Sequence, residues 1–77
     1  MENKYHLFLE DIGNTIKNYA LEAKKIKDSS NDSEEIKFQT GYLCGFHRII
    51  TLMQQQAEIY DISLKEINLD INENDLI

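Results

Sequence analysis

The sequence has one cysteine, Cys44, and no proline among its 77 residues. A single thiol excludes a disulfide within the chain, so a domain of this small size has no covalent cross-link. The N-terminal residues, MENKYHLFLED, also lack the apolar stretch of a secretory leader. Together these two features are typical of a reducing compartment, and we expect a cytoplasmic protein. The absence of proline favours long, uninterrupted helices.

Long apolar runs and positive charge are also scarce. No segment approaches the roughly 20 apolar residues that span a bilayer, so we expect no membrane partner. The net charge is −6, from 14 acidic and 8 basic side chains, which argues against direct binding of nucleic acid. Residues 61–77 hold much of the excess, because they carry five carboxylates and a single basic residue, Lys65.

The segment 34–60 is the one around which the rest of the chain is expected to fold. At helical period its apolar residues occupy four adjacent rows, which is wider than the stripe of a helix covered from one side. We therefore expect this helix to be covered from two directions. The rows are Ile36, Leu43, Ile50 and Ala57; Phe46, Met53 and Tyr60; Tyr42 and Ile49; and Phe38, Gly45, Leu52 and Ile59.

An earlier helix is predicted over residues 3–27, where apolar residues recur at alternating spacings of four and three. The polar linker 28–33, DSSNDS, is short enough to make the two helices antiparallel neighbours, and Asp32 is the predicted N-cap of the second. The residues of the first seam are Tyr5, Leu9, Ile12, Ile16, Tyr19, Ala23 and Ile26.

The C-terminal part of the chain contains one further helix signal. Ser63 and Glu66 have the spacing of a capping box, which predicts a short helix over 64–68. An acidic tail, 69–77, follows it. Leu69 and Ile71 are expected to pack on the hairpin, and the polar residues 72–77 are expected to be mobile.

These elements predict a single all-α domain over 1–77: an antiparallel helical hairpin with a short C-terminal helix. The first helix offers a narrower apolar face than the second, so part of the second stays uncovered. A two-fold axis would bury this surplus, and we expect two hairpins to form a four-helix bundle. The residues assigned to the dimer and packing interface are Tyr42, Leu43, Gly45, Phe46, Ile49, Ile50, Leu52, Met53, Gln56 and Ile59.

Within 34–60, a pair of glycines and one glutamine are predicted to take part in packing. Gly41 and Gly45 are four residues apart and lie on one flank, a pattern that lets another backbone approach closely. Among the three consecutive glutamines, Gln54 and Gln55 are expected to be solvated. Gln56 is the candidate for a hydrogen bond inside the bundle.

No motif identifies a reaction, and we expect neither catalysis nor a cofactor. Cys44 and His47 are three residues apart, a spacing that could provide half of a zinc site or a nucleophilic pair. Both lie on the polar side of the predicted helix, however, away from the apolar rows. A surface thiol and a surface imidazole are the simpler interpretation, and we assign no metal site.

The function indicated by these features is protein–protein interaction, as a small regulator or adaptor that acts as a homodimer. Its partners would be a second copy of itself and a protein that the sequence does not identify. An alternative is an acidic inhibitor that mimics nucleic acid and blocks a DNA- or RNA-binding protein, which the acidic residues of 61–77 would suit.

Overall fold

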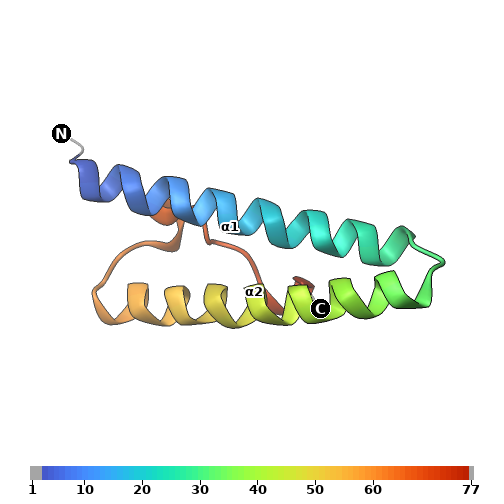
Figure 1. Cartoon of the computed structure of the whole chain (residues 1–77). Helices are drawn as coiled ribbons and strands as arrows, with labels where there is room; N and C mark the ends of the chain where they lie inside the picture. The colour runs from blue at the N-terminus through green and yellow to red at the C-terminus, as the bar shows by residue number, and fades with distance from the viewer. Residues whose placement is uncertain (1–2, 77) are drawn as a thin grey trace.

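Two long antiparallel helices form the frame of the protein in a computed structural model that describes residues 3–76 (Figure 1). Helix α1 spans Lys4–Ser29 and helix α2 spans Ser33–Ile59. Two short 3-10 helices follow, η1 at Leu64–Ile67 and η2 at Glu73–Leu76. The described residues contain no strand. The molecule is elongated, with principal extents of 47 × 20 × 14 Å.

The ends of both long helices are fixed by polar side chains. Asn3 Oδ1 accepts a hydrogen bond from the backbone N–H of His6 at 2.9 Å, and α1 begins there. Asp32 caps α2, as predicted, by accepting the N–H of Glu34 at 2.9 Å. Helix α1 continues to Ser29, whose hydroxyl donates to the Lys25 carbonyl at 2.8 Å. The connection is therefore shorter than the predicted linker and consists of residues 30–32.

The core between the helices is asymmetric. Helix α1 contributes small buried residues, Gly13, Ala20 and Ala23, while α2 contributes Leu43, Ile50 and Ala57. The predicted α1 seam is therefore wrong in part. Its members Leu9, Ile16 and Ala23 face the core, but its aromatic and outer members are exposed on the flank of the helix. These exposed members are Tyr5, Ile12 and Tyr19.

Gly13 accounts for the rotation of α1. A Cβ atom at this position would overlap the carbonyl oxygen of Ile67, so the backbone of η1 lies directly against the helix here. Asn68 follows with a left-handed φ of 59° and donates from Nδ2 to the Glu10 carbonyl at 3.1 Å. The side of α1 that carries Gly13 must consequently face η1.

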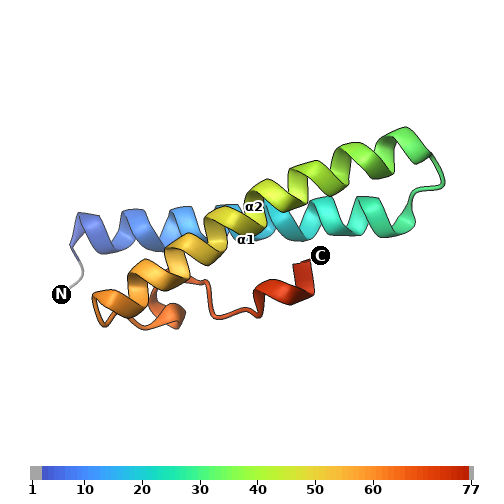
Figure 2. The same ribbon diagram turned by 90° about the horizontal axis from the view of Figure 1, so that it is seen from below.

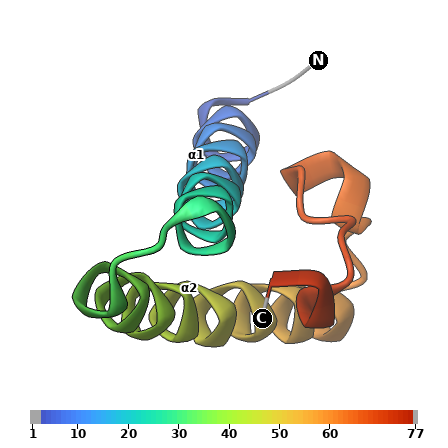
Figure 3. The same cartoon turned by 90° about the vertical axis from the view of Figure 1, so that its right-hand side faces the viewer.

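The chain reverses after α2 and runs back along one side of the hairpin (Figures 2 and 3). Ser63 and Glu66 form the predicted capping box at the start of η1. Further along, Gln54 Nε2 donates to the carbonyl oxygens of Leu69 at 3.0 Å and Ile71 at 2.9 Å. The expectation that Gln54 is solvated is thus wrong, because its amide holds the extended backbone between η1 and η2.

The tail also differs from the expectation that residues 72–77 are mobile. Leu76 in η2 is 1% exposed and belongs to the same core cluster as Leu43 and Ile50. Burying this leucine offsets the cost of ordering the polar residues that precede it. Ile77, which the prediction also covered, lies outside the described residues.

Gly13→Ala should lower the free energy of unfolding by about 1–3 kcal/mol, because the added methyl group meets a backbone oxygen rather than a flexible side chain. Gly41→Ala is the matched control. Nothing lies within 4 Å of a Cβ at Gly41, so that change should stabilise the helix by up to about 1 kcal/mol. Urea unfolding of the two variants checks the pair, and equal effects would contradict the close approach at Gly13.

Leu76→Ala should destabilise the protein by about 2–5 kcal/mol, as expected for a leucine removed from a packed core. The control is Leu21→Ala, since Leu21 is 46% exposed on α1 and its truncation should change stability by less than about 0.5 kcal/mol. Thermal unfolding followed by circular dichroism measures both. An unchanged melting temperature for Leu76→Ala would show that η2 is detached in solution.

Candidate interaction surface

The side of the hairpin opposite the C-terminal segment remains largely apolar and uncovered; we call it the open face. In Figure 3 residues 62–76 lie to one side of α1 and α2, and no other described segment covers the opposite side. The positions on this uncovered side include several of the most exposed apolar residues of the protein. The open face comprises Tyr5, Phe8, Ile12 and Tyr19 from α1, and Phe38, Tyr42, Ile49, Leu52 and Ile59 from α2.

The α2 part of the open face has the spacing of a coiled-coil seam. Starting at Phe38, seven exposed positions follow one another at intervals of 4, 3, 4, 3, 4 and 3. Phe38 is 65% exposed, Leu52 54% and Ile59 70%. We call these positions the α2 seam: Phe38, Tyr42, Gly45, Ile49, Leu52, Gln56 and Ile59. A heptad repeat on the outside of a single chain is the pattern that a second helix normally covers.

The middle of the same helix, residues 38–57, carries almost no charged side chains. Between Lys37 and Glu58, Arg48 is the only Lys, Arg, Asp or Glu. Solvated helix faces are normally rich in these residues, and the cores of protein interfaces are depleted in them. The outer surface of α2 therefore resembles an interface more than it resembles a solvated helix.

An aromatic cluster connects the two helices at one end of the open face. Tyr19 of α1 meets Phe46 of α2 edge to face, with ring centroids 6.0 Å apart. The ring centroid of Tyr42 lies 4.9 Å from that of Phe46 and 5.9 Å from that of Phe38. Neighbouring rings lie within 6.0 Å of one another, so the cluster forms a continuous apolar surface across the two helices.

An apolar pocket of about 300 Å³ lies at the other end of the open face. The helices diverge towards the N-terminus of α1, as Figure 1 shows, and the pocket occupies the wider end. Leu52 and Gln56 of the α2 seam form part of its wall, so the pocket opens onto the seam. The remaining wall residues are Leu9, Met53, Ala57, Tyr60, Ile62 and Ile67.

The ten residues predicted for the interface fall into three groups in the structure. Leu43 and Ile50 are fully buried within one chain, and Phe46 and Met53 are partly buried against the same core. The remainder face outward on the α2 seam. These are Tyr42, Gly45, Ile49, Leu52, Gln56 and Ile59.

Gln56 and the glycine pair Gly41 and Gly45 are all exposed on α2. Gln56 is exposed on the α2 seam of one chain, so its hydrogen bond inside the bundle stays a prediction. The glutamine that bonds within one chain is Gln54, to the returning backbone. Nothing lies within 4 Å of a Cβ at Gly41 or Gly45. Close packing at these glycines is therefore not used within one chain.

Apolar periodicity alone does not predict that the open face includes residues of α1. Their spacing predicts that Tyr5, Ile12 and Tyr19 belong to the seam facing the second helix. The signal that could have separated them is residue size. Gly13 and Ala20 are adjacent to this seam on the helical wheel, and small residues permit the closest backbone approach.

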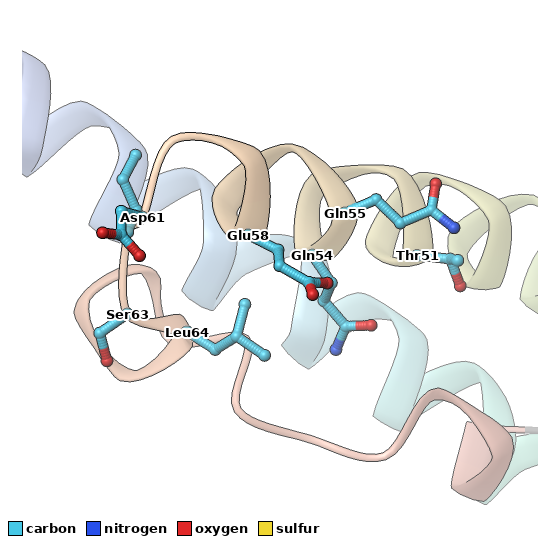
Figure 4. Close-up of a pocket in the computed structure, with 8 residues that line it drawn as sticks. Thr51, Gln54, Gln55, Glu58, Asp61, Ser63 and Leu64 are labelled. Atoms are coloured by element: carbon cyan, nitrogen blue, oxygen red, sulfur yellow. The ribbon is translucent and has the colours of Figure 1, made fainter.

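A polar hollow lies on the side of α2 nearest the reversal of the chain (Figure 4). Its volume is about 620 Å³. In the figure Gln54, Glu58 and Leu64 point toward one another, whereas Gln55 and Asp61 point away. Gln54 is occupied by its two backbone hydrogen bonds. Two described carboxylates, Glu58 and Asp61, line this hollow, and only Glu58 points toward Gln54 in Figure 4.

Cys44 and His47 lie beside the open face and line a surface hollow together with Gly45 and Leu52 of the α2 seam. Cys44 is exposed, while His47 Nε2 and Thr51 Oγ1 are covered and have no hydrogen-bond partner. Among the described residues no three His, Cys, Asp or Glu side chains are grouped so that they could hold a metal ion. The described helices also include none that is long and apolar enough to cross a bilayer.

Comparisons of the chain with models of protein families, with curated proteins and with solved structures give no significant match.

Cys44→Ser should leave the helix content unchanged and should change the free energy of unfolding by less than about 0.5 kcal/mol. The reason is that the thiol is exposed on α2 and is not part of the α2 seam. In the unsubstituted protein the same thiol should react with a chromogenic disulfide reagent in the folded state. Slow labelling that requires denaturant would show that Cys44 is covered, and would contradict this placement.

Proposed function

We propose that this chain is a small regulator or adaptor without catalytic activity, which acts as a homodimer. Two hairpins would join through their open faces into a four-helix bundle. The observation that carries the proposal is the α2 seam, a heptad repeat that lies on the surface of one chain and is almost free of charge. An isologous contact satisfies such a repeat, because the same seam supplies both halves of the contact.

The surface area of the chain supports this proposal. One chain exposes 5649 Å², whereas a compact monomer of 9.0 kDa is expected to expose about 4850 Å². The excess is about 800 Å², the area that each partner buries in a standard protein–protein interface. A radius of gyration of 13.9 Å, against about 11.5 Å for a compact domain of 77 residues, reflects the same elongation. Pairing along the long axis would reduce the area that each chain exposes and would give a more compact particle.

The regulatory role would rest on the surfaces that the dimer leaves free. Most of the C-terminal segment lies to one side of α1 and α2 (Figure 3). Ile62 and Ile67 line the apolar pocket, but η2 and the residues just before it would stay outside the bundle. The exposed carboxylates Asp70 and Asp75 of this segment would then be available to a basic partner. Binding that weakens steeply with salt would favour the nucleic-acid mimic, and salt-insensitive binding would favour an adaptor that uses apolar contacts.

Light scattering after size exclusion tests the dimer. The wild-type protein at micromolar concentration should have twice the 9.0 kDa mass of one chain. Ile49→Asp should give the mass of one chain, because it places a charge in the centre of the α2 seam. Leu21→Asp is the matched control, since Leu21 is 46% exposed and Ile49 45%, but Leu21 lies outside the open face. A wild-type mass of 9.0 kDa would contradict the proposal.

A further inference from the structure

The α2 seam has a projecting aromatic ring at one end and a hollow at the other. Phe38, near the N-terminus of α2, is 65% exposed. The apolar pocket opens at Leu52 and Gln56, near the C-terminus of the same helix. A projection and a hollow of matching chemistry on one surface are the two halves of a self-complementary contact.

From this arrangement we propose, on the basis of the dimer above, that the two α2 helices pair antiparallel and that Phe38 of each copy inserts into the apolar pocket of the other. In a parallel pair, two-fold symmetry would bring Phe38 against Phe38 and the pocket against the pocket, leaving both pockets unfilled. In an antiparallel pair the same symmetry brings ring and pocket together twice.

One antiparallel register brings Phe38 to the pocket and also pairs most of the seam with itself. Placing Phe38 opposite Gln56 of the second copy places Tyr42 opposite Leu52 and Gly45 opposite Ile49. Every seam position from Phe38 to Gln56 then faces another seam position. Shifting the register by one heptad toward the C-terminus pairs the seam from Tyr42 to Ile59 in the same way. It leaves Phe38 opposite Ser63, however, in the turn that follows α2, so the pocket would receive no ring.

Gly45 fits this register for a steric reason. No atom lies within 4 Å of the position that a Cβ would occupy there, so the space beside Gly45 is free in one chain. Ile49 of the second copy would fill that space at the two-fold axis. The small residue lets the helix backbones approach closely at the crossing, which is the role that the sequence suggests for this glycine.

The pocket has the chemistry of an aromatic anchor site. Its wall is apolar except for the Gln56 amide at the rim and the phenol of Tyr60. Met53 contributes a thioether that adapts to the shape of an inserted ring. Aromatic side chains seated in such pockets commonly dominate the binding energy of an interface.

Distances between spin labels decide the orientation. The label is attached at Asn31→Cys, in the connection before α2, in a Cys44→Ser background. The proposed register separates the two labels by about 50 Å at 1.5 Å per residue. A parallel pair would bring them within about 20 Å, given interhelical distances of 8–10 Å. A second label at Arg48→Cys, beside the proposed axis, should give a short distance in either arrangement and shows that the dimer is present.

Removal of the ring tests the contact itself. Phe38→Ala should raise the dimer dissociation constant at least about tenfold, while Phe38→Leu, which keeps an apolar group, should have a smaller effect. Leu21→Ala should leave the constant unchanged. Circular dichroism at matched concentrations verifies that each variant keeps its helices.

The outcomes separate this inference from the proposed function. A dimer with a short Asn31 distance would overturn the antiparallel arrangement and leave the dimer standing. A long distance with no effect of Phe38→Ala would overturn the insertion of the ring. A monomeric wild-type protein would overturn both proposals and would leave the pocket to a ligand or partner of another kind.

Discussion

The structure depends on the close approach between Gly13 of α1 and the backbone of Ile67 in η1. Because the glycine has no side chain, η1 can lie directly against α1, where the Asn68 side chain reaches the Glu10 carbonyl. The Gln54 amide then holds the extended backbone of Leu69 and Ile71 over α2. One side of the hairpin is thus covered by 15 residues, 62–76. None of the described residues 3–76 covers the other side, and this uncovered side is the open face.

The sequence was a good guide wherever one local interaction decides the structure. The long helices follow from apolar periodicity and the absence of proline, and Asp32, Ser63 and Glu66 act as the caps that their spacing predicts. The orientation of α1 could not be obtained in this way. It is set by a contact between residues 13 and 67, which are far apart in the chain. Gly13 also has no hydrophobicity that would place it in an apolar row.

The three glutamines and the tail are further places where a local sequence pattern does not predict the contact. Gln54, Gln55 and Gln56 are chemically identical, and only the position of the returning backbone determines which one is engaged. Leu76 follows a run of polar residues that is typical of a mobile terminus. It is buried in the same core cluster as Leu43 and Ile50, which it reaches only because residues 62–76 return along the hairpin. Both errors therefore have one origin, the path of residues 62–76, which no local pattern encodes.

Helix α2 has two apolar faces with different roles, and this division links the fold to the proposed function. Its inner row, Leu43, Ile50 and Ala57, is buried in the single chain and supports its stability. Its outer row is the α2 seam, which adds little to the stability of one chain because it faces solvent. The effects of substitutions on the two rows should therefore be distinguishable. Changes in the inner row should lower the melting temperature by the same amount at every protein concentration. Outer changes act on association, so their effect on the melting temperature should grow with protein concentration.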